Sequence, residues 1–169
     1  MRRYREFFMK AAVILGTVLM ALTLPAQADP VAQGEHAFRR GDYQRAAKKF
    51  RPPARHGNPV AQTYMGFLSQ TGRGIPQFRP GAAKYYQWAA EQGNPVAQYN
   101  LGLLYDKGHG VPQNYVLAHK WVNLAASRSR GDEREYYTRI RDAIESKMSH
   151  DQLETAQYLA HDWEKSHRR

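Results

Sequence analysis

Histidine is the residue type in this chain that most readily suggests a metal site or acid–base chemistry, because neutral imidazole ligates zinc and titrates near neutral pH. The seven histidines are His36, His56, His109, His119, His150, His161 and His167. No two of them are four residues apart, the spacing that places two zinc ligands on one face of a helix. We therefore expect no metal site. His109 in a turn and His119 on a helix are expected to face solvent.

Nucleophilic and carboxylate chemistry is equally weakly supported. The chain has no cysteine, which excludes thiol catalysis and cysteine-based zinc sites. The serines lie in neither a nucleophile elbow nor a Ser-x-x-Lys context; the four considered are Ser69, Ser127, Ser129 and Ser146. The acidic residues Asp132, Glu133 and Glu135 gather at an expected helix start, where the helix dipole favours them for structural reasons. We therefore expect no catalytic residue.

Two glycine-rich segments, 72–74 and 108–110, superficially suggest phosphate-binding loops. Neither segment follows a predicted strand, and neither carries the lysine that a P-loop needs. We interpret both as turns and expect no cofactor.

The same two turns belong to a longer internal repeat. The sequence Gly-Asn-Pro-Val-Ala-Gln at 57–62 returns thirty-six residues later at 93–98. The residues that return at the same offset further on include Gly66, Gly72, Gly74, Pro76, Gln77, Ala82, Lys84, Ala89 and Ala90. A fixed period of this size is typical of proteins in which one supersecondary unit buries its apolar face by stacking on a copy of itself.

Each repeat predicts two helices joined by a glycine turn. Asn94 is a typical N-cap and Pro95 suits the first helical position, so the first helix of each copy, helix A, is expected over 59–69 and 95–106. The branched residue of the turn, Ile75 or Val111, should fill the gap between the two helices. Asn114 should cap the second helix, helix B, of the second copy.

Two places are expected to deviate from regular helix. Phe78 stands where the first copy needs a helix cap, so its helix B is expected to start later or to fray. Pro52 and Pro53 follow a helical pattern that Asp42 can cap, and each proline lacks an amide donor, so we expect a kink or break near Arg51.

Beyond Arg128 the repeat register is lost. Helices are still expected there, because the apolar side chains of Tyr137, Ile140 and Ile144 recur at helical spacing. Ser149 to Gln152 forms a capping box that opens a final helix. The expected organisation is a segment 1–28, N-terminal capping helices at 29–56, repeats at 57–92 and 93–128, and C-terminal capping helices at 129–169. Eight helices in antiparallel pairs are expected, with boundaries near Gly41, Gly57, Gly93 and Gly131.

The pattern of the second copy resembles the Sel1-like repeat, a relative of the tetratricopeptide repeat. The residues that carry the resemblance are Ala97, Leu101, Gly102, Tyr105, Gly108, Gly110, Val111, Ala118, Trp121, Ala125 and Ala126. The first copy departs from the pattern at Ser69, where the family has an aromatic residue, and at Phe78. The resemblance implies an all-α fold, a short α-solenoid with helical caps at both ends.

The N-terminal segment has the composition of a secretory signal peptide. Basic residues precede an apolar run from Ala11 to Leu24, and small residues follow up to Ala28. The run is shorter than the roughly 20 residues of a spanning helix. Cleavage between Ala28 and Asp29 is therefore expected, which predicts a periplasmic or secreted protein without stable membrane insertion. An uncleaved anchor is the alternative.

If the helices stack as in tetratricopeptide proteins, helix A of each copy lines a concave face. The candidate ligand-binding residues on that face, outside the core stripe, are Thr63, Phe67, Gln70, Tyr99, Asn100, Leu103 and Asp106. The alternative is that these side chains pack on neighbouring helices.

Two functions remain open at this point. The resemblance implies a non-enzymatic adaptor that binds a protein or peptide of the cell envelope. The alternative is a glycan-binding protein or hydrolase of the bacterial cell wall. Without residues 1–28 the chain has 25 − 4 = 21 basic and 15 − 1 = 14 acidic side chains, a net charge of +7. That charge also suits an anionic envelope polymer, and the alternative is an ordinary solvated surface. No nucleic acid is expected, because the basic residues are scattered except at Lys165, Arg168 and Arg169.

Overall fold

A computed structural model describes residues 29–167, so the expected signal segment with its cleavage site, and the last two residues, lie outside the described residues. Between residues 29 and 167 the chain forms eight helices and no strand, which confirms the all-α prediction. The helices are α2 (Pro30–Arg39), α3 (Tyr43–Arg55), α4 (Pro59–Thr71), α5 (Arg79–Glu91), α6 (Pro95–Lys107), α7 (Tyr115–Arg128), α8 (Gly131–Glu145) and α9 (His150–Ser166).

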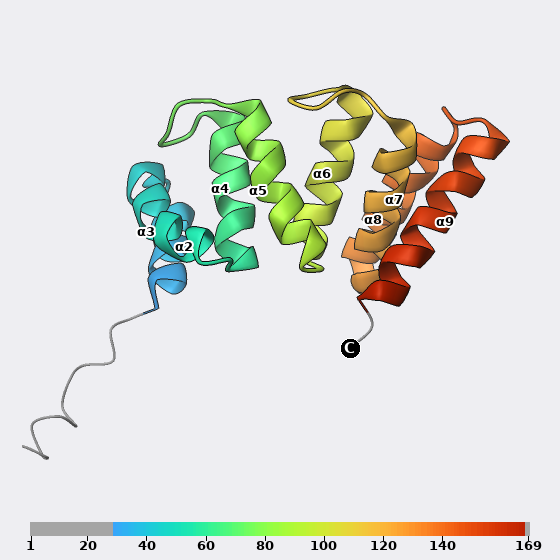
Figure 1. Cartoon of the computed structure of the whole chain (residues 1–169). Coiled ribbons are helices and arrows are strands. Elements are labelled where there is room, and N and C mark those ends of the chain that lie inside the picture. Colours follow the sequence, from blue (N-terminus) through green and yellow to red (C-terminus); the bar gives the residue numbers. More distant parts are fainter. Residues whose placement is uncertain (1–28, 168–169) are drawn as a thin grey trace, which may run out of the picture.

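From α2 to α7 each helix packs on the next, and both α8 and α9 then pack on α7, as can be followed in Figure 1. The loops that join α4 to α5 and α6 to α7 lie at the same edge of the molecule, so the two copies have the same orientation. This arrangement is the predicted solenoid, in which each helix pair packs on the next. No helix in the described range is long and apolar enough to cross a membrane.

The repeated asparagine, proline and glycine residues determine where the helices of each copy begin and end. Asn58 and Asn94 cap α4 and α6 by accepting from the amides of Ala61 and Ala97, both at 2.9 Å. A proline occupies the first turn of both helices. Helix α4 ends at Thr71 and α6 at Lys107, two residues and one residue beyond the predicted ends, and each is followed by a glycine in the left-handed region.

The expected break in α3 is wrong. The helix continues through Pro52 and Pro53 to Arg55. Phe50, two residues before Pro52, and Ala54, directly after Pro53, are both buried in the core. Their packing holds this stretch helical although two amide donors are missing.

The expected late start of α5 is also wrong. The helix begins at Arg79, thirty-six residues before the first residue of α7. Phe78 provides no side-chain cap, but its amide donates to the carbonyl of Ser69 and the Ser69 hydroxyl donates to its carbonyl, both at 2.9 Å. Pro80 in the first turn needs no donor. The serine that departs from the family pattern therefore positions the residue before the helix.

In the first three helix pairs, a glycine of the first helix packs against a side chain of the second. A β-carbon at Gly34, Gly66 or Gly102 would come within 2.5 to 2.7 Å of a side-chain atom of Phe50, Tyr86 or Val122 respectively. Such distances are well below van der Waals contact. The close approach expected at Gly102 is confirmed.

The turns and the C-terminal cap also follow the sequence. Ile75 and Val111 pack against the core, as expected for residues that fill the gap between helices. Ser149 and Gln152 form the predicted capping box at the start of α9. Helix α9 packs on α7 and buries Ala160 and Trp163.

Candidate functional site

The candidate site is a groove that crosses the first helices of the helix pairs. It has a volume of about 480 Å³. Its lining comes from α2, α4 and α6, with one residue of α5 and the cap of α6; the residues are Glu35, Phe38, Val60, Thr63, Tyr64, Phe67, Tyr86, Asn94, Val96 and Asn100. The groove therefore spans the partial N-terminal unit and both repeats.

Aromatic rings form a rigid floor. Phe38 meets the rings of Tyr64 and Phe67 edge-on, at centroid distances of 4.9 and 5.4 Å. Tyr64 also stacks on the buried Phe50 at 4.4 Å. Because these rings hold one another in place, the apolar surface is formed before a ligand arrives, which lowers the entropy cost of binding.

The polar groups at the groove are few. Burial, followed by the nearby charge of Glu35, raises the pKa of Tyr64, and burial raises the pKa of Tyr86 well above its ordinary value. Both phenols therefore stay protonated at neutral pH. The Tyr86 hydroxyl donates to Gln70 Oε1 at 2.9 Å. Glu35 is the one carboxylate among the lining residues.

Three of the predicted ligand-binding residues, Thr63, Phe67 and Asn100, line this groove. The Thr63 hydroxyl donates to its own helix, at the carbonyl of Pro59, and Asn100 Nδ2 donates to the carbonyl of Val96. Phe67 is half-buried and packs against two core clusters.

The other four predicted residues do not line it. Gln70 is the acceptor for Tyr86, and Leu103 is half-buried on α6. The ring of Tyr99 stacks on that of Tyr137 of α8 at 4.6 Å, and its hydroxyl lies 2.9 Å from the Tyr136 hydroxyl. Helix α8 thus covers part of the helix A face of the second repeat.

Asp106, on the same helix as Tyr99, also bonds to the C-terminal cap instead of lining the groove. It is only 4% exposed, and its carboxylate accepts from Lys147 Nζ at 2.6 Å and pairs with Lys107 at 3.0 Å. Burial acts to raise the pKa of Asp106, but the two lysines outweigh it and hold that pKa below its ordinary value. Asp106 therefore joins α6, as an ionised side chain, to the turn that follows α8.

Sequence reasoning missed several groove residues and one buried pair. Val60 and Val96 line the groove and occupy the same position of the repeated hexapeptide, which was the available signal. The glutamines of that hexapeptide, Gln62 and Gln98, are buried. Each donates its side-chain amide at 3.1 Å to the last turn of the preceding helix, and so ties one helix pair to the next.

The expectation that His119 faces solvent is wrong. Its side chain is 2% exposed, whereas His109 is exposed as expected. His119 occupies the repeat position of the buried residues Ala47 and Ala83, a register that the sequence already contained. Burial lowers the pKa of His119, and Glu145, whose Oε2 lies 3.5 Å from Nε2, acts in the opposite direction.

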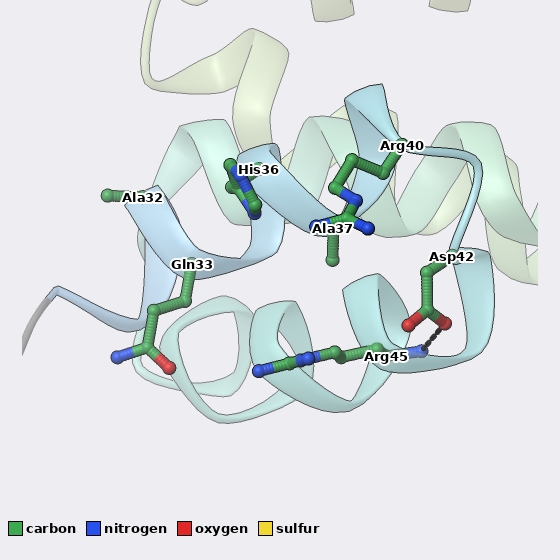
Figure 2. Close-up of a pocket in the computed structure, with 7 residues that line it drawn as sticks. All are labelled: Ala32, Gln33, His36, Ala37, Arg40, Asp42 and Arg45. Carbon is green, nitrogen blue, oxygen red and sulfur yellow. Dashed lines mark hydrogen bonds between the residues drawn. The ribbon is translucent and has the colours of Figure 1, made fainter.

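No group of three histidine, aspartate or glutamate side chains within residues 29–167 is placed to hold a metal ion. A larger hollow, of about 640 Å³, lies between α2 and α3 (Figure 2). Its polar side chains spread along the hollow instead of converging, and its carboxylate, Asp42, caps α3 by accepting from the amide of Arg45 at 3.1 Å. The aromatic groove is therefore the better candidate site.

Comparisons with known proteins agree with this architecture. The family model described as Sel1 repeat matches residues 59–94 and 95–129. A protective antigen of uropathogenic Escherichia coli that displays an SLR fold is 32% identical, with a TM-score of 0.74; the match covers 81% of this chain and 30% of that protein. A Sel1 repeat protein from Oxalobacter formigenes is 36% identical, with a TM-score of 0.60, over 63% of this chain and 43% of that protein.

The chain thus spans less than half the length of either solved protein. A comparison with curated proteins found no significant match.

Proposed function

This chain is a Sel1-repeat protein, and from that premise we propose that it is an exported, non-enzymatic adaptor that binds a segment of a partner protein in the groove across α2, α4 and α6. The observation that carries the proposal is the aromatic floor made by Phe38, Tyr64 and Phe67, which is held in place by the repeat core. Stacked helical repeats provide extended concave surfaces of this kind for peptide segments.

The lining defines the chemistry of the segment. Its apolar side chains suit a large apolar anchor, and anchors that become fully desolvated each contribute about 2 kcal/mol or more to binding. Glu35 is the charged residue of the lining, so a basic residue beside the anchor would complete the match. We therefore propose a partner segment with an aromatic or large aliphatic side chain next to a lysine or arginine.

A hydrolase acting on the cell wall is less well supported by this groove. Glycosidases use two carboxylates on opposite sides of the scissile bond. The groove lining contributes Glu35 alone, and its two phenols stay protonated. Binding without turnover is the activity that these side chains favour.

Export is the second part of the proposal, and it rests on the composition of residues 1–28. Basic residues, an apolar run and small residues before Asp29 follow one another in the order of a secretory signal peptide. An adaptor exported in this way would meet its partner protein in the cell envelope or outside the cell.

Selection from a library of displayed random peptides tests the groove directly. Selected peptides should share a large apolar residue beside a basic one. Val96→Arg should abolish their binding, because Val96 is 40% exposed in the groove and the substitution places a long cation there. Gln87→Arg is the matched control, since it adds the same charge at an exposed position of α5 outside the groove lining.

Equal binding by the Val96→Arg variant and the control would refute the groove. Sedimentation of the chain with purified wall polymer, together with release of soluble fragments, would instead establish the glycan alternative. Both variants should be checked for unchanged melting temperature before binding is compared.

A further inference from the structure

Helix α9 is held to the second repeat by a well-defined socket for its tryptophan. Trp163 Nε1 donates to Glu91 Oε2 at 2.7 Å, and the ring meets that of Trp121 edge-on at a centroid distance of 6.1 Å. The guanidinium of Arg128 covers the ring at 4.5 Å. We call this set of residues, together with Ala90 and Leu124 of the same core cluster, the second-repeat socket.

The equivalent place in the first repeat is open. A hollow of about 600 Å³ is lined there by Ala54, Arg55, Gln62, Tyr85, Trp88, Glu91 and Gln92. Five of these residues, Ala54, Arg55, Tyr85, Trp88 and Gln92, stand thirty-six positions before the five residues of the second-repeat socket. We call this hollow the first-repeat socket.

The first-repeat socket presents an aromatic surface. Trp88 is 52% exposed, and Tyr85 meets its ring edge-on at 5.6 Å, so the indole is supported from one side. Single exposed aromatic residues are ordinary. This one stands at the position of Leu124, which is fully buried in the second repeat, within the cluster that also contains Trp163.

We propose that the first-repeat socket docks an amphipathic helix of a partner protein in the way that the second-repeat socket docks α9. This surface is separate from the proposed peptide groove, with which it shares no lining residue. The way α9 binds the second-repeat socket defines the geometry of the occupant. One helix packs on α5, as α9 packs on α7, and one large ring reaches the end of α3, as Trp163 reaches the end of α5.

The two sockets differ in the polar residue that would bond to the inserted ring. Arg55, a donor, stands where the acceptor Glu91 receives the indole N–H of Trp163. The occupant's ring should therefore carry an acceptor, and a tyrosine hydroxyl supplies one in place of an indole N–H.

The residue that follows the ring in the occupant should be positively charged, whereas the corresponding residue of α9, Glu164, is negatively charged. Glu164 of α9 accepts from Ser127 Oγ at 3.1 Å and lies 3.8 Å from Arg128 Nη1. The corresponding residues of the first-repeat socket are Glu91 and Gln92. A lysine beside the tyrosine fits there, whereas a glutamate would be repelled by Glu91.

Two synthetic helices test the proposal. The first is the α9 sequence, residues 150–166, held helical by a hydrocarbon staple; the second is the same peptide with Trp163→Tyr and Glu164→Lys. Each is titrated into the ¹⁵N-labelled full chain and followed by NMR. The exchanged peptide should bind about tenfold more tightly than the α9 peptide, the effect of one charge-assisted hydrogen bond. The amides of Tyr85, Trp88 and Gln92 should shift.

Two chain variants separate recognition from a general effect on structure. Arg55→Ala removes the donor to the tyrosine hydroxyl and should remove part of the preference for the exchanged peptide, since the contact of its lysine with Glu91 is kept. Trp88→Ala should weaken the exchanged peptide by about tenfold or more, since it removes the aromatic surface. Tyr158→Ala, which removes a more exposed ring from α9, is the control and should change neither affinity.

Any of three results would overturn the proposal. The exchanged peptide could fail to bind saturably, or Arg55→Ala could leave the preference for it unchanged. Shifts confined to Trp121 and Arg128 would show that the peptide displaces α9 from the second-repeat socket and that the first-repeat socket takes no helix.

Discussion

Gly102 offers the sharpest test of how the repeats pack. A β-carbon at this position would lie 2.5 Å from Val122 Cγ2 and 3.0 Å from the carbonyl oxygen of Ala118. The valine methyl would have to retreat by about 1 Å to reach ordinary contact. The backbone oxygen cannot rotate away. Overpacking of this kind costs about 1 to 3 kcal/mol, and a leucine, which fills more space than a methyl group, should reach the upper end of that range or exceed it.

The smaller change, Gly102→Ala, isolates the contact with Val122. Alanine favours the helical backbone over glycine by about 1 kcal/mol, which offsets part of the packing cost. The net destabilisation should therefore be about 1 kcal/mol. Val122→Ala alone should cost about 2 kcal/mol, because the side chain is fully buried. In the double variant the new methyl group enters the space that valine leaves. The two changes should then be less than additive by about 1 kcal/mol or more.

Urea unfolding, followed by far-ultraviolet circular dichroism, measures the free energy of unfolding of the unaltered chain, Gly102→Ala, Val122→Ala and the double variant, and of Gly102→Leu. Pro95→Ala is a useful comparison, since it changes a first-turn residue of the same helix and should cost less than about 1 kcal/mol. Additive effects of Gly102→Ala and Val122→Ala would refute the reasoning, as would a Gly102→Leu variant with unchanged stability.

Two further predictions concern His119, which contacts Glu145 of the C-terminal cap, and the N-terminus. Burial lowers the pKa of His119 in the folded state against the opposing effect of Glu145, with Arg141 and Asp142 also nearby, so its contribution to stability is present above the unfolded value near 6.5 and is lost as pH falls below it. Unfolding free energies measured at several pH values between 7.5 and 5 should therefore fall less steeply for His119→Ala than for the unaltered chain; equal slopes would contradict the assignment. For export, mass analysis of the secreted or periplasmic protein should find Asp29 as the first residue, and a terminus at Met1 in the membrane fraction would show that the segment is an anchor.

The helix pattern could be predicted from the sequence because most helix starts are set by a local capping residue. Asn58, Asn94, Asn114 and Ser149 all cap helices in the structure. The two local errors arose where packing overrode local preference. Pro52 and Pro53 lie inside a helix that is anchored by buried neighbours, and Phe78 is held by the backbone and side chain of Ser69.

The groove could be predicted only in part, because its extent depends on contacts between distant segments. Thr63, Phe67 and Asn100 follow from the face of helix A, whereas Phe38 and Glu35 come from α2, which lies outside the repeat register. Tyr99 and Asp106 lie on the same face of α6 as a repeat pattern requires. No repeat rule shows that α8 and Lys147 contact them.

The contact of α8 with Tyr99 also limits the length of the groove, and so the length of the segment that the protein can bind. The groove extends from α2 to α6, and at Tyr99 the helix A face is covered by the rings of α8. The number of repeats between the two caps therefore acts as a molecular ruler. Inserting one more copy of residues 57–92 directly after Gln92 keeps Tyr99 and Asp106 against the C-terminal cap. It should lengthen the segment that can be bound by one helix pair, without changing the chemistry of either end.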